Sequence, residues 1–468
     1  MKNRFDFLDK QSNSSEISWL FKLVLFLALW GLVAPTVAAG QIDRIQLKTV
    51  PIRHWNFSNV DKDAQMWSGM YIASNNRIYI GLCTHGDAAN VYEFDIEKEQ
   101  MRHLANLTVL LGERGKGIWT NGKIHVQMQE LDGYIYFGSL CEDNGPPRID
   151  ASSYRGPWWF RISMETGEVT PLSRINSFWG LLGQCMDKQR RLIYGLAEDG
   201  HLYKYYIDED WTEDLGRVDD WDICRTIFLD DLGRVHGSYP PGRLWRYNPE
   251  QDRIFDLKLL RLPVALGSRN ATNPMLDRRS QWRIIEWDPV TRCAYGIVGG
   301  SNMLFRYDVH DSHTGNIDVL TQVSAPMYRG GDPSEVPHAT LAMTISQTER
   351  KIYYIPVISG DFDYAAVNPD FGRVSPKKAR GSALSGDQMP PLSFMISYDL
   401  ETGERRDIGL LRADDGRWAY GMGGAETDRQ GRIWFVGAFE ESDPGYVARK
   451  IRNKFPYSMG LGCYDPAK

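Results

Sequence analysis

Apolar and aromatic residues recur along this chain in short runs that end in glycine or in a polar turn. One strand ending, two mostly apolar residues followed by Gly or once by Pro, occurs at residues 79–81, 136–138, 193–195, 235–237, 294–296, 354–356 and 435–437. Aromatic and β-branched residues favour a pleated, half-buried surface, whereas Gly and Pro interrupt it. The pattern therefore predicts many short β-strands joined by turns.

Each strand ending is followed, after a turn or loop, by a second strand that closes on an aromatic or apolar residue. Asp or Asn usually comes next, as in residues 92–95, 245–248 and 305–308. A polar turn of the form Asp-x-x-x-Arg precedes several endings, for example at 230–234 and 428–432. Seven such copies, without an amphipathic helix of convincing length, predict an all-β fold, a seven-bladed β-propeller.

The last copy is incomplete, because the chain stops at residues 465–468, where the outer strand of that blade should begin. Residues 44–50, RIQLKTV, precede the first copy and have a strand-like pattern. We predict that this N-terminal strand completes the last blade and closes the ring, which leaves only short strand edges. Residues 41–468 would then form one propeller domain.

Residues 1–40 have the layout of a secretory signal peptide. Residues 23–39 are uncharged, Lys22 precedes them, and residues 36–39 offer a small-x-small cleavage site. A retained signal anchor is the alternative, although 17 uncharged residues interrupted by Pro35 are short for a membrane span. We therefore predict a secreted or periplasmic protein with no stable membrane span after cleavage.

The longest insertions gather on one face of the predicted ring. Residues 142–157 and 359–392 fall between the second and third strands of their blades. Such loops share a face with the start of each innermost strand, which we call the entry face. Because long loops are uncommon and often functional, we predict the functional site on the entry face.

A column of residues five positions before each polar turn lies near the start of the innermost strands. It reads Ser68, His125, Leu182, Arg225, Arg283, Leu341 and Gly423. Its polar members either form hydrogen bonds with polar groups of neighbouring blades or form a His–Arg–Arg cluster at the mouth of the channel. Tyr239, Arg243, His85 and His338 are expected on the same face.

This set of residues suits the cleavage of a uronate-containing polysaccharide by β-elimination. Arg225 or Arg283 would neutralise the uronate carboxylate and so acidify the neighbouring C–H. His125 would remove that proton as the base, and Tyr239 would protonate the departing oxygen. The expected substrate-binding residues are Arg243, His338 and His85.

The expected partner is an anionic polysaccharide or oligosaccharide. A net charge of −6 disfavours nucleic acid, but a local basic patch still permits capture of an anionic glycan. Trp158, Trp159 and Trp282 either stack on sugar rings or fill blade interfaces. The sequence has no glycine-rich phosphate loop, GxSxG element or HExxH motif, so it assigns no cofactor or metal site.

Residues 122–125 (GKIH), followed by 132–138 (DGYIYFG), resemble a blade entry of the seven-bladed polysaccharide lyases of the ulvan lyase and oligogalacturonate lyase type. Residues 238–247 (SYPPGRLWRY) are similar to their blade turns. The resemblance implies a polysaccharide lyase in which His125 matches the first of two histidines on early blades. Leu140 and Cys141 stand where the second histidine is expected. The alternative function is a non-catalytic propeller that binds a glycan or a protein on the same face.

Overall fold

The computed structural model divides the chain into two units, Met1–Ile45 and Gln46–Lys468, and every residue it describes lies in the second. The described residues are 47–57, 66–83, 89–142, 151–218, 224–263, 278–330, 336–358, 392–440 and 457–468. The predicted signal peptide, His85 and most of the insertion at 359–392 lie outside them. Among the described residues, no helix is long and apolar enough to cross a membrane.

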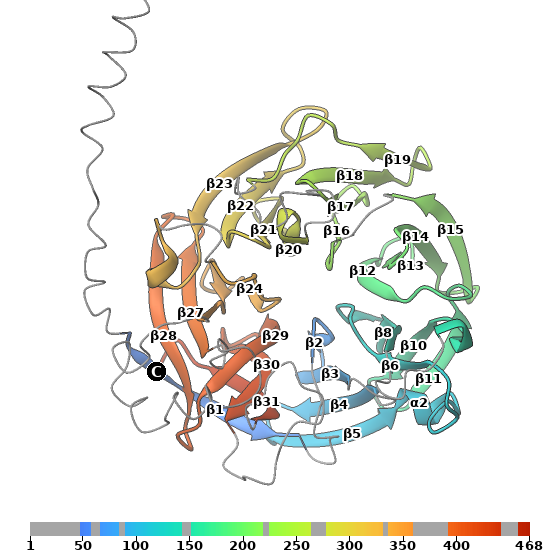
Figure 1. Cartoon of the computed structure of the whole chain (residues 1–468), viewed down its shortest axis with the longest axis horizontal. Coiled ribbons are helices and arrows are strands. Elements are labelled where there is room, and N and C mark those ends of the chain that lie inside the picture. The colour runs from blue at the N-terminus through green and yellow to red at the C-terminus, as the bar shows by residue number, and fades with distance from the viewer. Residues whose placement is uncertain are drawn as a thin grey trace, which may run out of the picture. The chain divides into compact units, whose positions relative to one another are not determined.

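The second unit is a ring of seven blades, each with four antiparallel strands that follow one another from the axis outward (Figure 1). The predicted seven-bladed β-propeller is therefore confirmed. The first blade comprises β2 (Met70–Ile72), β3 (Arg77–Cys83), β4 (Ala89–Asp95) and β5 (Gln100–Asn106). The second comprises β7 (Gln129–Leu131), β8 (Tyr134–Gly138), β10 (Trp158–Ser163) and β11 (Val169–Arg174). The third comprises β12 (Leu181–Asp187), β13 (Leu192–Ala197), β14 (His201–Tyr206) and β15 (Trp211–Arg217).

The next three blades repeat this arrangement. The fourth blade comprises β16 (Phe228–Leu229), β17 (Val235–Tyr239), β18 (Arg243–Asn248) and β19 (Arg253–Asp256). The fifth comprises β20 (Trp282–Asp288), β21 (Cys293–Val298), β22 (Met303–Asp308) and β23 (Asn316–Gln322). The sixth comprises β24 (Met343–Ser346), β25 (Lys351–Tyr354), β27 (Leu392–Asp399) and β28 (Arg405–Ala413). The short elements beside the blades are β6 (Thr120–Lys123), β9 (Leu140–Glu142), β26 (Val357–Ile358), α2 (Leu107–Leu110), η1 (Ala151–Ser153), η3 (Arg278–Ser280) and η4 (Pro326–Tyr328).

The seventh blade is completed by a strand from the start of the described chain. Its inner strands are β29 (Ala419–Thr427), β30 (Ile433–Glu440) and β31 (Tyr457–Tyr464), and its outer strand is β1 (Thr49–Asn56). Residues 53–56 of β1 pair antiparallel with β31, while residues 49–52 pair parallel with β28 of the sixth blade. Closure by an N-terminal strand is thus confirmed, although the strand begins at Thr49 and extends beyond the predicted residues 44–50.

The glycine of the repeated strand ending makes room for an aromatic ring. A Cβ atom on Gly237 of β17 would lie 2.2 Å from the ring of Trp245, which faces it across the sheet from β18. On Gly138 a Cβ would lie 2.4 Å from Leu181 of the next blade and 3.2 Å from Trp159. Because protein interiors are close-packed, a side chain at either position would displace the core between blades.

The repeated polar turns are held together by their aspartates. Asp230 accepts hydrogen bonds from the backbone N–H groups of Leu232 and Arg234 at 3.0 and 2.9 Å. Its side chain also accepts from Arg234 Nε at 2.6 Å and from His236 Nε2 at 3.0 Å. Burial alone would raise the pKa of Asp230, but the hydrogen bond from His236 and the nearby positive charges hold it well below its usual value. These turns are structural, and His236 is a packed core histidine that stacks on Phe228.

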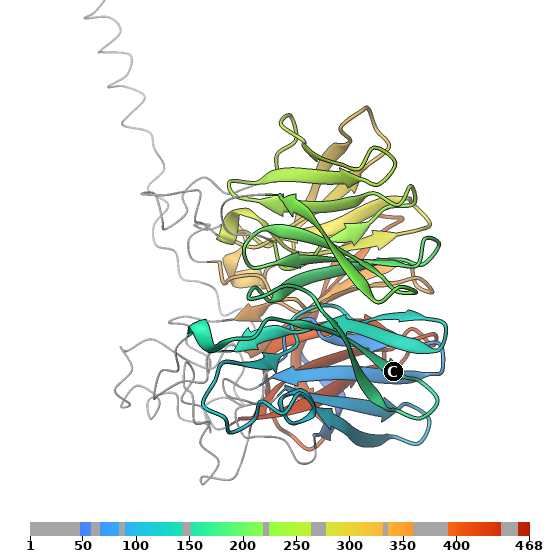
Figure 2. The ribbon, with the colours of Figure 1, turned by 90° about the vertical axis from the view of Figure 1, so that its right-hand side faces the viewer.

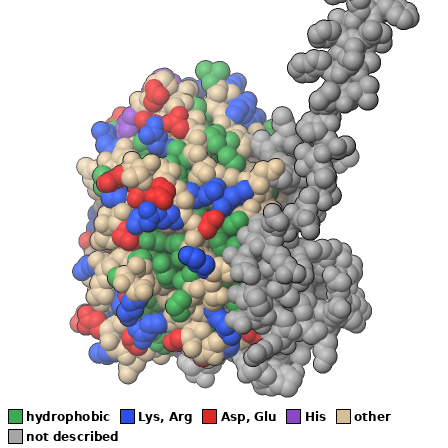
Figure 3. Space-filling model, turned by 90° about the vertical axis from the view of Figure 1, so that its left-hand side faces the viewer, with side chains coloured by type: hydrophobic (Ala, Val, Ile, Leu, Met, Phe, Trp, Pro, Cys, Tyr) green, Lys and Arg blue, Asp and Glu red, His purple; other side chains and the backbone are tan. Residues whose placement is uncertain are grey.

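The edge-on view shows the blades side by side around the axis (Figure 2). On the outer edge seen in Figure 3, acidic and basic side chains are interspersed around a stretch of apolar ones. Exposed ion pairs that involve the outer strands β23 and β28 include Arg306–Asp318 and Arg406–Glu404. Such exposed pairs contribute little to stability.

Candidate binding site at the entry face

Two polar residues of the predicted column connect consecutive blades. Ser68 Oγ, just before β2, donates a hydrogen bond to the carbonyl oxygen of His125 in the second blade. His125 lies between β6 and β7, and its Nδ1 donates to the carbonyl oxygen of Leu182 in the third blade at 2.8 Å. These hydrogen bonds agree with the inter-blade interpretation of Ser68 and His125, and they fix the imidazole in one orientation.

His125 is buried among positive charges. Its side chain is only 1% exposed, and the ring stacks on Trp67 with 5.5 Å between centroids. The pKa of His125 is well below its ordinary value because of burial and, after that, because of the charges of Arg225, Lys123 and Arg283. Every charged side chain that acts strongly on this imidazole is cationic, so His125 is neutral at neutral pH.

Trp67 lies where these cations converge. Lys123 Nζ is 4.8 Å from the centroid of its ring, and the guanidinium carbon of Arg283 is 5.8 Å from it. Both distances allow an attraction between a cation and the face of the ring. We define the cationic mouth as Trp67, Lys123, His125, Arg225 and Arg283, all of which precede or open an innermost strand on the entry face.

His338 and Arg279 extend the cationic mouth toward the sixth blade. Arg279 of η3 donates from Nη2 to the carbonyl oxygens of Gly300 and Val336 at 2.9 and 2.8 Å. The imidazole of His338 is accessible at the surface but closely surrounded by protein atoms. This loss of hydration, followed by the charges of Arg283, Arg279 and Arg225, lowers the pKa of His338 to about 3. The structure therefore brings four of the predicted site residues together: His125, Arg225, Arg283 and His338.

Tyr239 and Arg243 lie elsewhere in the fourth blade. The side chain of Tyr239 is 4% exposed and belongs to a hydrophobic core cluster with Cys224 and Trp282. Arg243 lies over the ring of Tyr239 at 4.6 Å and forms an ion pair with Asp256 of the outer strand β19. In this conformation a substrate oxygen has little access to the Tyr239 hydroxyl, and the ion pair of Arg243 points away from the axis.

The aromatic residues available to a ligand differ from those that the sequence suggested. Trp159 and Trp282 are at most 1% exposed and fill blade interfaces, and Trp282 Nε1 donates to the carbonyl oxygen of Thr226 at 2.8 Å. Trp158 is half-buried, with Arg174 over its ring. Trp179, in the connection that leads to β12 on the entry face, is 43% exposed.

Sequence reasoning missed Trp67 and Lys123, although a local pattern pointed to both. Trp67 directly precedes Ser68 of the column, and Lys123 is two residues before His125. Side chains two positions apart in an extended segment lie on the same side. Among the described residues, no group of three or more His, Cys, Asp and Glu side chains is arranged to hold a metal ion. The arrangement instead provides converging cations beside an aromatic ring, which suits electrostatic capture of an anion.

No protein-family model and no curated protein matches the sequence. Solved structures that are similar include RRP9 WD40 repeats, with a TM-score of 0.51 and 7% identity over 90% of this chain and 100% of that chain. A chain from the mitotic checkpoint complex has a TM-score of 0.48 and 9% identity over 99% of this chain and 98% of that chain. U3-55K has a TM-score of 0.49 and 7% identity over 88% and 98%. The likeness is one of fold alone.

Proposed function

We propose that this protein is a non-catalytic binding propeller whose entry face recognises an acidic glycan. The ligand class is a polysaccharide or oligosaccharide that contains uronate residues. The predicted signal peptide supports action in a secreted or periplasmic setting, where such glycans occur.

One observation carries this proposal: among the described residues, the charged groups that act most strongly on His125 and His338 are cations. Arg225 and Arg283 act on both imidazoles, and Lys123 and Arg279 act on one each. A rigid ring that holds several cations near one aromatic residue creates a local positive potential in a protein of net charge −6. Guanidinium groups bind carboxylates in a bidentate manner, and the exposed Trp179 offers a face for a sugar ring.

The proposal is tested by isothermal titration calorimetry with polygalacturonate and with neutral dextran. We expect binding to polygalacturonate that weakens as salt is added, and none to dextran. Arg225→Gln and Arg283→Gln should each reduce the affinity about tenfold, because each removes a charged hydrogen-bonding group. Arg292→Gln is the matched control, since Arg292 is an exposed arginine whose ion pair with Asp231 lies at the polar turns.

Two results would contradict a glycan ligand. Equal affinity for dextran and polygalacturonate would exclude recognition of the uronate carboxylate. Binding of a poly-glutamate peptide, combined with no binding to any of a panel of uronate-containing glycans, would assign the entry face to an acidic protein segment.

Cleavage by β-elimination is the second candidate function, and one observation favours it. Because Nδ1 of His125 donates to Leu182, Nε2 is the basic nitrogen of a neutral imidazole, as a general base requires. The burial of His125 beneath Trp67 opposes this role unless Trp67 moves. Incubation with the same glycan panel should distinguish the two functions, because elimination creates a double bond that absorbs ultraviolet light. Product formation that is lost in His125→Ala would establish the lyase; binding without product would support the binding propeller.

A further inference from the structure

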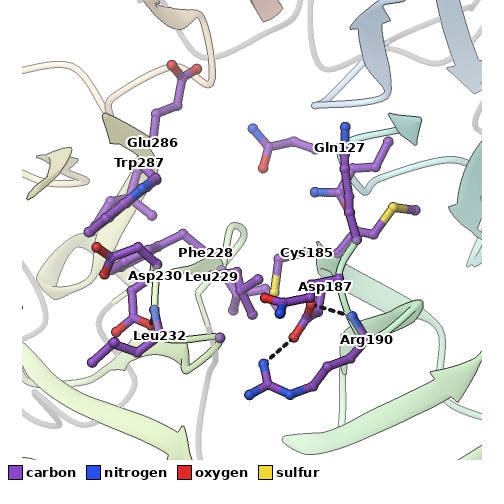
Figure 4. A pocket seen from close by; sticks show the side chains of 18 of the residues that line it. Gln127, Cys185, Asp187, Arg190, Phe228, Leu229, Asp230, Leu232, Glu286 and Trp287 are labelled. Carbon is purple, nitrogen blue, oxygen red and sulfur yellow. Dashed lines mark hydrogen bonds and ion pairs between the residues drawn. The ribbon is translucent and has the colours of Figure 1, made fainter. Parts of the chain in front are cut away.

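A second site lies in the channel, at the opposite end from the cationic mouth. An open cavity of about 770 Å³ is lined by the innermost strands of six blades and by the polar turns of the third and fourth. Figure 4 shows Glu286 and Gln127 on opposite walls of this cavity. Its lining contains six acidic side chains and two basic ones, whereas the mouth is lined by basic side chains.

Two of the carboxyl groups lie deep within the cavity. Glu286 of β20 and Glu426 of β29 both line it, and their charges interact. The backbone N–H of Ile345 donates to Glu286 Oε2 at 3.1 Å. Burial and the charge of Glu426 raise the pKa of Glu286 well above its ordinary value, and burial raises that of Glu426 to about 8. Among the described residues, no cation acts appreciably on either carboxyl.

The other polar groups around the pair are acceptors or weak acids. Gln129 Oε1 is buried and has no hydrogen-bond partner among the described residues. Tyr71 lines the same wall, and burial followed by the charges of Glu426 and Glu130 raises its pKa. The rim is different, because Arg190 there forms an ion pair with Asp187 at 2.7 Å. One of the two basic side chains of the lining is therefore paired at the rim, while Gln129 Oε1 in the interior is an acceptor without a partner among the described residues.

We propose that this cavity binds an organic cation, a primary amine or a guanidinium group, between Glu286 and Glu426. The two carboxylates and the amide oxygen of Gln129 supply acceptors for its N–H groups. Trp287 and Tyr71 supply aromatic faces that attract a cation. The donor set contains two carboxylates and no histidine, which is too few for a metal site built from side chains. The cation is either a free diamine or the side chain of a lysine on another protein. In both cases an ammonium group donates its N–H groups to the carboxyl pair.

The proposal is tested by calorimetry on the full chain with 1,4-diaminobutane, its neutral analogue 1,4-butanediol, an acetylated Gly-Lys-Gly amide, and CaCl2. We expect the diamine or the peptide to bind and the diol not to bind. Tighter binding of the diamine would indicate a free diamine as the ligand, and tighter binding of the peptide would indicate a lysine side chain. Because a cation favours ionised carboxylates, affinity should rise from about pH 6 to about pH 8 with release of protons. Glu286→Gln and Glu426→Gln should each reduce affinity at least about tenfold.

Both variants keep the shape of the side chain and replace a carboxyl group whose ionisation burial disfavours, so thermal unfolding should show them as stable as the parent protein or more so. Glu250→Gln is the control at the rim and should leave affinity unchanged. Three outcomes would overturn the proposal: equal binding of the diol, unaltered affinity in both inner variants, or Ca²⁺ binding tighter than either amine. Binding that depends on Glu250 alone would also overturn it, because the cation would then lie at the rim. The site is independent of the entry face, so failure here leaves the glycan proposal untouched.

Discussion

The two ends of the channel gather ionisable side chains of opposite kind, and in each place the surroundings favour the neutral form of a buried group. At the cationic mouth, arginine and lysine surround His125 and keep its imidazole neutral. In the acidic cavity, burial favours the protonated form of Glu286 and Glu426, and the charge of Glu426 raises the pKa of Glu286 further. In both places burial, together with nearby groups of like charge, favours the neutral form of an ionisable side chain.

One strand contributes to both ends. β20 has Arg283 near its start, facing the mouth, and Glu286 near its end, lining the cavity. The polar turns contrast with both regions, because each of their aspartates is paired with an arginine or with backbone N–H groups. The polar turns thus pair their charges within the fold, whereas each candidate site brings several ionisable groups of the same kind close together.

The largest expected effect comes from breaking a neutralised turn. Asp230→Ala should lower the free energy of unfolding by about 3–5 kcal/mol, because it leaves Arg234 and His236 without their buried partner. Chemical denaturation measures this change. Asp208→Ala is the control, since Asp208 is 55% exposed in its pair with Arg191 and should show no measurable change. Equal loss in both variants would contradict the distinction between turn and surface pairs.

Reversing charge at the mouth should have the next largest effect. The double variant Arg225→Glu/Arg283→Glu should weaken binding to polygalacturonate more than about 100-fold, because attraction becomes repulsion. The pKa of His125, followed by NMR of its imidazole, should rise at the same time. An unchanged affinity in a folded double variant would remove the mouth from the binding site.

The acidic pair predicts a distinct dependence of stability on pH. The pKa of Glu426 in the folded protein, about 8, lies above the value of about 4.3 expected in the unfolded chain. The folded state therefore binds the extra proton between these values, and stability should fall as pH rises through this window. Glu426→Gln should make that slope shallower by about 1 kcal/mol per pH unit. Denaturation at several pH values measures the slope; identical slopes would show that Glu426 ionises normally.

The smallest effect is expected from Lys123→Met. Removing one of the three cations that act on His125 should raise the pKa of this histidine by less than about one unit. Binding of polygalacturonate should fall only a few-fold, because Arg225 and Arg283 remain. A loss as large as that of the double arginine variant would make Lys123 the main contact.

The repeat made the fold predictable, because each blade carries its own glycine, polar turn and aromatic strand. The column through His125, Arg225 and Arg283 was also predictable, since equivalent positions in a ring meet at the axis. The acidic pair was not predictable, because a bulge in β20 between Trp282 and Ile284 shifts the alternation of residues between the two faces of the strand. The sequence alone therefore does not show which face of β20 carries Glu286. Tyr239 lies at the end of β17, and its burial depends on packing between blades, which no local pattern encodes.

The divided pairing of β1 has a consequence for how the protein is made. Residues 49–52 pair with one blade and residues 53–56 with the next, and both partners lie more than 350 residues later in the chain. β1 is therefore synthesised before both of its partner strands, and it cannot pair until β28 and β31 have been made. Contacts so distant in sequence slow folding, and they make closure of the ring a single late event. A chain that crosses a membrane from its N-terminus would remain an open, unfinished ring until its final strand has crossed.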